Sequence, residues 1–467
     1  CSCFLVESSP DGQCQVCFAP GTLVRTDKGY EPIEDIKVGD KVLSSDGKFH
    51  EVLNNFVTPY EGELISIYPS VSTKPIFVTP EHPFLVQRGS HEVSTGCGPK
   101  CDKYIKNGNG NSRKPDVRKI KSGKWHARVG IGGRGGKRIA LGTFSTEEEA
   151  IKVVKEYKIK NIQPGHILEW DTADKLKEND WLVAKWTTLE KSIETINIPK
   201  KFLGHSYQQR KGLDHFEVNE DFLWMIGLYL AEGSSGNREI YFSLHEKEVE
   251  YQNRLINFFE KNGYNPHLRK NSARDDYKGI NVCVASTTLA SWFPVWLGKY
   301  CDKKSIPEEL MRLPINKLQH IWKGVDDGDG VVGRNEIIQT SEILALQLME
   351  ILHRLGEQPL LRQYKSNVKT PNGNTRKLAY CVNWEVDTFN NKNRKGKWKF
   401  EENELSKIRK TGKIYYSGKV YNLEVKDDPT YVVNGVVTHN CHGTGIVGGY
   451  TKFGTVDHTI DVTHPGL

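Results

Sequence analysis

Short apolar runs separated by Gly and Asp turns dominate the first part of the chain. Residues 17–53 read CFAPGTLVRTDKGYEPIEDIKVGDKVLSSDGKFHEVL, in which β-branched runs alternate with turn residues as in a compact all-β unit. The same strand-and-turn pattern returns in residues 165–186, GHILEWDTADKLKENDWLVAKW, and near the end in KVYNLEV and TYVVNGVV. The pattern therefore predicts an all-β domain that is interrupted and then resumed along the chain.

Two apolar stretches between these β segments predict buried helices. The first is DFLWMIGLYLAEGS (221–234), and LQHIWKGVDDGDGVV (318–332) repeats its plan. Each stretch has two small residues four positions apart, which would let two helices approach closely: Gly227 and Ala231, and Gly324 and Gly328. Each helix then ends in an acid followed by glycine, Glu232 and Asp329. An acid at a helix C-terminus is unfavourable against the helix dipole, so a matching pair indicates a function.

Charge distinguishes a third segment. Residues 111–138 hold ten Lys or Arg and one Asp, whereas the whole chain has a net charge of +7. This density favours a polyanion partner, most simply nucleic acid, although a solvated charged loop has the same composition. Residues 122–158 predict two strands, a Gly-rich turn and a helix, which Ser145 and Glu148 would begin as a capping box.

The bulk composition limits the class of protein. A chain of 467 residues predicts about three domains, and the absence of a run of eighteen apolar residues predicts no membrane span. The first residues resemble no signal peptide and lack an initiator Met, so we expect a piece of a longer precursor. The ten cysteines do not have the spacing of a disulfide framework, which favours a reducing compartment. We therefore expect a cytoplasmic, monomeric protein without a membrane partner.

Three short blocks carry residues that indicate chemistry when they are taken together. Cys17 opens the first β unit, Thr79 and His82 are spaced T-x-x-H in VTPEHPF, and residues 438–441 read THNC. Taken singly, these are a buried cysteine, a strand-capping threonine, a surface histidine and an ordinary loop. In this order, and with the strand pair KVYNLEV and TYVVNGVV, they resemble an intein, a self-splicing element with the Hint fold. The resemblance covers residues 17–440.

The resemblance implies the first half of a splicing reaction. Cys17 would attack the carbonyl of Val16 and convert the peptide bond into a thioester, because cysteine is intrinsically nucleophilic as a thiolate. His82 would lie at the Val16–Cys17 amide and protonate the leaving nitrogen, since the pKa of a histidine is ordinarily near neutral. Thr79 would hydrogen-bond the same amide.

The second half would take place at the other end. Cys441 would take the acyl group from Cys17, and Asn440 would then cyclise onto its own carbonyl, which His439 polarises. An S-to-N shift would leave Val16 joined to Cys441. Two positions depart from the family pattern. Asn422 stands in YNL where many inteins have Asp, and Pro429 stands where many have His. Asn cannot accept a proton as a carboxylate does, so the second half is expected to be tuned differently.

The paired helices resemble those of the LAGLIDADG homing endonucleases, which have an α+β fold. In that family the two helix-terminal acids, here Glu232 and Asp329, bind divalent metal, usually Mg²⁺, for hydrolysis of both strands of DNA. Between the helices, KKSIPEELMRLP resembles the K-x-I-P block of intein endonucleases. The resemblance makes Lys304 the candidate catalytic lysine and Lys303 the second choice, while an exposed lysine pair is the alternative.

The basic segment resembles the DNA-binding domain of plant ethylene-response factors, which has a three-stranded sheet and one helix. Four side chains would lie where that sheet faces the major groove: Trp125, Arg128, Arg134 and Arg138. Cys97 and Cys101 precede the segment as CGPKC, and two ligands do not make a metal site, so we interpret them as unpaired structural thiols.

The flanks predict a further metal site. Cys1, Cys3 and Cys14 join Cys17 as C-x-C and C-x-x-C, and Cys441 would replace Cys17 after splicing. Four thiolates at this spacing suit a tetrahedral Zn²⁺ site, although surface thiols of a fragment are the alternative. Splicing itself needs no cofactor.

The sequence thus predicts a multidomain intein precursor: an all-β, discontinuous Hint splicing domain interrupted by a DNA-binding insert and an α+β LAGLIDADG domain. Its expected partners are double-stranded DNA carrying the uninterrupted host site and the host flanks joined by splicing. One rival is a splicing-competent DNA-binding protein with a decayed endonuclease, and another is a Hedgehog-like domain that cleaves without ligating. The predicted division is 1–16 host flank, 17–95 splicing domain, 96–162 DNA-binding insert, 163–194 splicing domain, 195–405 endonuclease, 406–440 splicing domain and 441–467 host flank.

Overall fold

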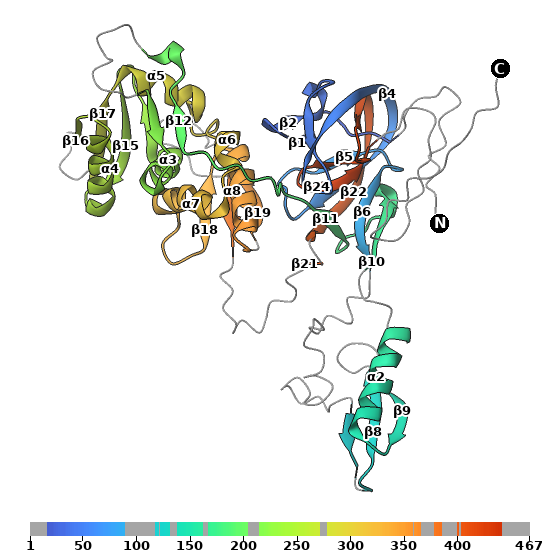
Figure 1. The fold of residues 1–467 in the computed structure, drawn as a ribbon. Helices are drawn as coiled ribbons and strands as arrows, with labels where there is room; N and C mark the ends of the chain where they lie inside the picture. Colours follow the sequence, from blue (N-terminus) through green and yellow to red (C-terminus); the bar gives the residue numbers. More distant parts are fainter. Residues whose placement is uncertain are drawn as a thin grey trace.

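The computed structural model has three folded regions (Figure 1). The residues it describes are 16–88, 117–120, 122–130, 138–161, 167–203, 214–270, 278–357, 359–365, 378–384, 399–400 and 403–440. We call the large sheet the β domain, the elements from β12 to β20 the paired-helix domain, and β7–β9 with α2 the insert.

The β domain gathers strands from three separate parts of the sequence into one 12-stranded sheet. Its strands are β1 Leu23–Thr26, β2 Gly29–Pro32, β3 Lys41–Leu43, β4 Phe49–Pro69, β5 Ile76–Val78, β6 Pro83–Arg88, β10 Ile167–Thr172, β11 Trp181–Ala184, β21 Lys399–Phe400, β22 Asn403–Val425, β23 Thr430–Val433 and β24 Val436–His439. The main order is β10-β6-β11-β24-β23-β1-β3-β4-β22-β21, with β2 beside β1 and β5 beside β4. The prediction of an interrupted all-β unit is therefore confirmed in these residues.

Two long strands close the β domain across the whole length of the inserted chain. β4 and β22 pair antiparallel from Val52 opposite Val425 to Pro69 opposite Ile408. Phe18 is bridged to both Tyr421 and Val78, so the residues after position 16 are held between β22 and β5. Because β24 pairs with β6 and β11 as well as with β23, the last described residues lie beside the strand that follows His82.

The paired-helix domain is α+β. Its helices are α3 Glu220–Glu232, α4 Val249–Lys261, α5 Thr287–Trp296, α6 Glu308–Met311, α7 Ile315–Asp329 and α8 Glu342–Arg354. Its strands are β12 Thr195–Asn197, β13 His215–Glu217, β14 Gly233–Ser235, β15 Glu239–His245, β16 Pro266–Lys270, β17 Gly279–Ala285, β18 Glu336–Gln339, β19 Leu360–Lys365 and β20 Leu378–Asn383. They form the sheets β14-β15-β17-β16 and β18-β20-β19, with β12 paired to β13.

Glycines set the distance between α3 and α7. A Cβ on Gly227 would lie 2.1 Å from the carbonyl oxygen of Ile321, and one on Gly324 would lie 2.1 Å from the carbonyl oxygen of Trp224. One turn further along, a Cβ on Gly328 would lie 2.5 Å from that of Ala231. The predicted close approach of the two helices is confirmed, and it extends to the ends that carry the acids.

The glycines after the two acids end their helices, as predicted, but without a left-handed conformation. A glycine that ends a helix commonly adopts a left-handed conformation, but Gly233 has φ −79° and Gly330 has φ −66°. Both are extended, which any residue can adopt. Space is the reason instead, since a Cβ on Gly233 would lie 2.2 Å from the ring of Tyr229, and one on Gly330 would lie 2.2 Å from the carbonyl oxygen of Asp326.

The β domain and the second half of the paired-helix domain share a hydrophobic core. Apolar residues of α8, with Leu361, Tyr380 and Val382, belong to the same cluster as Val24 and Val42 of the β domain. These two large regions are therefore packed together, rather than joined only by linkers.

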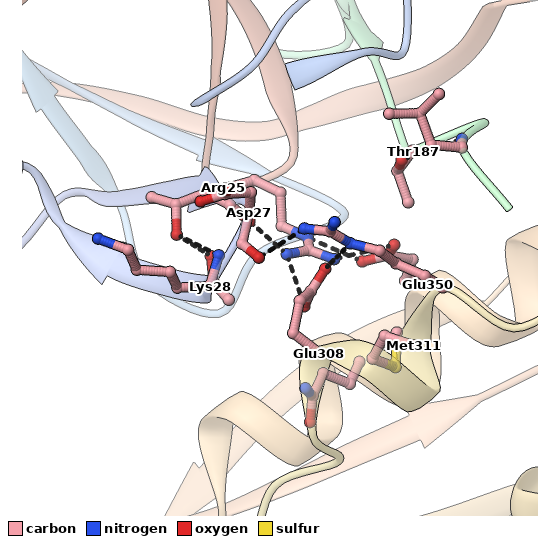
Figure 2. Close-up of polar contacts among 12 residues, drawn as sticks. Arg25, Asp27, Lys28, Thr187, Glu308, Met311 and Glu350 are labelled. Atoms are coloured by element: carbon pink, nitrogen blue, oxygen red, sulfur yellow. Dashed lines mark hydrogen bonds and ion pairs between the residues drawn. The ribbon is translucent and has the colours of Figure 1, made fainter. Parts of the chain in front are cut away.

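An ion cluster lies at this junction (Figure 2). The side chain of Arg25, on β1, is 1% exposed and donates two hydrogen bonds to Glu308 of α6, at 2.9 and 3.0 Å. It also contacts Glu350 of α8 at 3.1 Å, and Tyr30 donates to the same carboxylate at 3.3 Å. Removing one member of such a cluster would leave the others buried and uncompensated, which typically costs about 3–5 kcal/mol.

The insert has a three-stranded sheet, β7 Val117–Lys119, β8 Trp125–Gly130 and β9 Arg138–Phe144, with α2 Glu147–Asn161 against it. The predicted strands and helix are therefore present. The capping box is one residue later than predicted. The Glu149 N–H donates to Thr146 Oγ1 at 3.3 Å, and the Thr146 N–H donates to Glu149 Oε2 at 3.3 Å.

Within the described part of the chain, every helix is too short or too polar to pass through a bilayer. The fold as a whole is a multidomain α+β arrangement around one large antiparallel sheet.

Gly324→Ala should destabilise the paired-helix domain by about 1–3 kcal/mol, because the added methyl meets the backbone of α3 rather than a side chain that can move. Chemical denaturation followed by tryptophan fluorescence measures this, since Trp224 lies in the interface. Gly236→Ala is the matched control, as its Cβ would lie 3.7 Å from its nearest neighbours and should change stability by less than about 0.5 kcal/mol. Equal stability of the two variants would contradict the close-packing argument.

Candidate functional sites

The peptide bond between Val16 and Cys17 is buried within the β domain. Cys17 is fully buried, and its N–H donates to Thr79 Oγ1 at 2.9 Å. The Thr79 N–H donates in turn to the Cys17 carbonyl at 3.0 Å. On the other side of the bond, the Val16 carbonyl oxygen accepts from Asn422 Nδ2 at 2.5 Å. Thr79 thus lies at the amide where the sequence predicted it.

His82 connects this bond to the far end of the chain. Its Nε2 lies 2.5 Å from Thr438 Oγ1, and the Thr438 hydroxyl donates to the Pro83 carbonyl at 3.1 Å. A hydroxyl has one proton, so Thr438 accepts from His82, and Nε2 carries the hydrogen. In the neutral ring Nδ1 is then the basic atom, and the whole side chain is buried.

Burial changes the titration of the two central residues. It raises the pKa of the Cys17 thiol to about 12. Burial, followed by the charge of His439, lowers the pKa of His82 to about 3, although the backbone of Val16 acts to raise it. The expectation of a near-neutral pKa for His82 is therefore wrong in this environment. At neutral pH the site holds a protonated thiol and a neutral imidazole, which can accept a proton but has none to spare.

The C-terminal end of the described chain lies beside this site. His439 Nδ1 donates to the Asn440 carbonyl oxygen at 2.7 Å, since that oxygen can only accept. The Asn440 side chain is buried, with Nδ2 donating to the Val425 carbonyl at 3.3 Å. Trp170 of β10 packs edge-on against the His439 ring at 5.2 Å. The contact to the Asn440 carbonyl is the one that the predicted role of His439 requires.

Several residues of this site were not predicted as functional. Thr438 and Trp170 contact His82 and His439 directly. Tyr431 donates to Asn422, which was noted only for its departure from a family pattern and which contacts Val16. Nothing in the sequence around these strand residues indicated a function, apart from the position of Thr438 next to His439.

The second candidate site lies where α3 and α7 end. Glu232 and Asp329 are the last residues of the two helices, and Gln339 donates to Asp329 Oδ2 at 2.6 Å. Burial, followed by the charge of Asp329, raises the pKa of Glu232 to about 7, while Lys304 acts to lower it. Burial also raises the pKa of Asp329. Two carboxyls that resist ionisation beside each other provide a ligand pair whose repulsion a bound divalent cation would relieve.

Lys304 lies at the end of α3 and offsets the unfavourable position of Glu232 there. Its Nζ donates to the carbonyls of Tyr229, Ala231 and Gly233 at 2.8, 3.3 and 2.8 Å. The Lys304 ammonium group thus supplies positive charge at the negative end of the helix dipole, where the negative charge of Glu232 is destabilising. Burial lowers the pKa of Lys304 to about 8, and both acids oppose this. Its three N–H donors are engaged by backbone carbonyls, so it is placed first of all to hold the helix end.

The DNA-binding candidates of the insert are only partly described. Trp125 packs against the small core of the insert, and Lys119 lies over its ring at 5.9 Å. Arg128 lies on the same strand and is half-buried. Arg134 and the side chain of Arg138 lie outside the described residues.

Of the cysteines in the predicted zinc site, Cys17 is described and fully buried. The others lie outside the described residues, as do Cys97 and Cys101; they are Cys1, Cys3, Cys14 and Cys441. Within the described chain, two other groups have ligand atoms within 4.8 Å of one another: Glu239, His267 and Cys283, and Asp46, His50 and Asp428. In the first group Arg269 already neutralises Glu239 at 2.7 Å. In the second, His50 contacts Asp46 at 3.1 Å.

Comparison with known proteins identifies part of the chain. Residues 16–98 match the family model described as a Hint domain, so the first strands of the β domain are those of a Hint domain. This match ends before the insert begins, and the resemblance of the insert to ethylene-response factors is unsupported.

Three curated relatives match nearly the whole chain. A protein of Methanocaldococcus jannaschii, itself uncharacterized, is 27% identical over 91% of this chain and 50% of its own length. The ATP-dependent DNA helicase Hel308 of Thermococcus kodakarensis is 24% identical over 92% of this chain and 36% of its own. An iron-sulfur cluster assembly SufBD family protein of Mycobacterium tuberculosis is 26% identical over 91% and 43%. The chain thus spans half or less of the length of these relatives.

Two kinds of solved structure are similar to parts of the chain. A mesophilic variant of the homing endonuclease I-DmoI matches 36% of this chain and 84% of its own at 13% identity, with a TM-score of 0.27. The gp41-1 intein matches 16% of this chain and 55% of its own at 30% identity, with a TM-score of 0.14. At these TM-scores neither match supports a functional role for this chain.

The acid pair should bind Mg²⁺ more weakly as the pH falls below 7. Protonated Glu232 cannot be a ligand, so each pH unit below its pKa should lower the apparent affinity about tenfold. Calorimetric titration at pH 6, 7 and 8 of a Cys17→Ala/Asn440→Ala chain measures this, and Glu232→Gln should lose most of the dependence. An affinity that is the same at all three pH values would contradict the assignment.

Proposed function

We propose that this chain is an intein precursor that excises residues 17–440, ligates Val16 to Cys441, and cuts double-stranded DNA with its paired-helix domain. The splicing part of this proposal is supported by the position of both predicted splice junctions in the same sheet. The Cys17 amide and the Asn440 carbonyl are each held by hydrogen bonds in one sheet, and the bond from His82 to Thr438 links them.

The relatives that match this chain have different names, as expected if the matching segment is an element that moves between host proteins. One relative is named as a helicase and the other as an iron-sulfur cluster assembly protein. In each, the match covers more than nine tenths of this chain but less than half of the relative's own length. This is the pattern expected of a segment inserted into different host proteins.

The first step follows from the buried site. The Cys17 sulfur attacks the Val16 carbonyl carbon while its proton passes to a base, and the neutral His82 offers Nδ1 for it. The same proton then goes to the Cys17 nitrogen as the C–N bond breaks and the thioester forms. A low pKa makes His82 a strong proton donor once it is charged. Burial therefore suits a shuttle better than a standing acid.

The last steps use the other end. Cys441 attacks the thioester and takes the acyl group, which frees the Cys17 thiol. The Asn440 side-chain nitrogen then attacks the Asn440 carbonyl carbon, whose oxygen accepts from His439 at 2.7 Å. The peptide bond to Cys441 breaks, a succinimide forms, and an S-to-N shift completes the new peptide bond. A Hedgehog-like domain that only cleaves would need neither Asn440 nor Cys441.

For DNA cleavage, Glu232 and Asp329 would hold Mg²⁺, which would neutralise charge on the scissile phosphate when bound. Lys304 would hold the end of α3 in place, and Gln339 would orient Asp329. The insert would add contacts to the DNA backbone through its basic segment. The alternative is a splicing-competent DNA-binding protein with a decayed endonuclease, and the presence of both acids favours the active form.

Expression of the chain should yield two products: a fragment with the mass of residues 17–440, and a ligated product of residues 1–16 joined to 441–467. Denaturing gels and mass spectrometry measure both. Cys17→Ala with Asn440→Ala should leave only the precursor, because both nucleophiles are lost. Release of either product from the double variant would exclude this mechanism.

Asp329→Asn should abolish Mg²⁺-dependent double-strand cleavage of DNA that carries the joined host sequence, because one carboxylate ligand is lost. Splicing should continue, since the acids lie outside the β domain. Agarose gel assays on linear DNA measure the first, and the mass of residues 17–440 the second. Cleavage at the wild-type rate by Asp329→Asn would overturn the assignment of the acid pair.

A further inference from the structure

Asn422 lies where negative charge would develop in the first step. It is fully buried on β22, and its Nδ2 is 2.5 Å from the Val16 carbonyl oxygen. That oxygen belongs to the carbonyl which Cys17 would attack. The sequence pattern indicates only that Asn422 lacks the proton-accepting carboxylate of an Asp. In the structure, its side-chain amide donates a hydrogen bond to the Val16 carbonyl oxygen.

The orientation of this amide is fixed by its other end. Asn422 Oδ1 accepts from the Tyr431 hydroxyl at 2.6 Å and from the Leu423 N–H at 2.8 Å. Two donors on one atom identify that atom as the oxygen, so the NH₂ group must face Val16. The amide therefore cannot turn its acceptor to the Val16 carbonyl without breaking both bonds.

The backbone around Asn422 holds the distance. Phe18 and Tyr421 exchange two backbone hydrogen bonds, each of 2.8 Å, immediately beside the Val16–Cys17 bond and Asn422. Thr79 holds the nitrogen of the same peptide bond at 2.9 Å. The scissile bond is thus held on its oxygen by Asn422 and on its nitrogen by Thr79, from two different strand segments.

We propose that Asn422 is a catalytic residue of the first acyl shift, donating to the Val16 oxygen as it becomes an oxyanion, and that Tyr431 is its positioning residue. The inference rests on the proposed splicing function. When the sulfur–carbon bond forms, the carbonyl electron pair moves to the Val16 oxygen. When the C–N bond breaks, that pair returns and the proton shuttled from the thiol ends on the Cys17 nitrogen. No further reactant is needed.

A neutral amide suits this position better than a carboxylate. An ionised Asp here would place an acceptor against the carbonyl oxygen and would repel the oxyanion, unless it carried a proton. Removing one donor from an oxyanion hole typically slows a reaction about 10²- to 10³-fold. The substitution to Asp thus has a signature that loss of packing alone would not produce.

The test isolates the first step in an Asn440→Ala/Cys441→Ala parent, in which only the thioester can form. Dithiothreitol cleaves the thioester, and the rate of N-terminal release is followed on gels from pH 5 to 8. Asn422→Ala should slow release about 10²- to 10³-fold, and Tyr431→Phe should slow it about tenfold. Asn422→Asp should be slow at pH 8 and should recover relative to the parent as the pH falls and its carboxyl becomes a donor.

Asn55→Ala is the matched control, because Asn55 also donates from Nδ2 to a backbone carbonyl, that of Ile36 at 2.7 Å, away from the scissile bond. It should release at the parental rate, and thermal unfolding shows whether each variant is folded. A folded Asn422→Ala that releases at the parental rate, or an Asn422→Asp that matches the parent at pH 8, overturns the inference alone. A parent that releases nothing, or that still releases after Cys17→Ala, overturns the proposed function as well.

Discussion

The pairing of β4 with β22 is the constraint on which the rest of the structure depends. These strands come from opposite ends of the sequence, and their register extends from Val52 opposite Val425 to Pro69 opposite Ile408. The chain between Pro69 and Ile408 must therefore begin and end at adjacent positions of the sheet, which β5, β6, β10 and β11 rejoin on the way. The pairing brings Asn422 to the Val16 carbonyl, and the neighbouring strands bring Thr438 to His82. A site assembled from both ends can form only when the sheet closes.

Burial controls the chemistry at both candidate sites, with opposite results. In the β domain it keeps the Cys17 thiol protonated and His82 neutral, so the resting site holds no free charge next to a peptide bond under attack. In the paired-helix domain it raises the pKa of two acids that lie at the ends of packed helices. There a divalent cation would compensate for the buried charge, whereas the proposed splicing steps move protons and acyl groups within the chain itself.

The shared core places a limit on how independent the two proposed activities can be. α8 packs into the hydrophobic cluster of the β domain, and Arg25 joins β1 to both α6 and α8 through buried carboxylates. The acids at the ends of α3 and α7 take no part in that cluster, so a change at Asp329 need not reach Cys17. A change at the Arg25 cluster, by contrast, would disturb both regions, because each supplies half of a buried charge pair.

The sequence by itself determined the local elements and the reactive residue types. Turn residues between β-branched runs predicted the β domain, and small residues four apart predicted the contact of α3 with α7, because both patterns follow from short-range geometry. The prediction that Gly233 and Gly330 end the two helices is confirmed, and neighbouring atoms rather than φ require glycine there. Only the tertiary structure decided the pKa of His82, the orientation of Asn422 and the capping of α3 by Lys304. Each depends on partners far away in the chain, 356 residues for His82 and Thr438 and 406 for Asn422 and Val16, which no local pattern specifies.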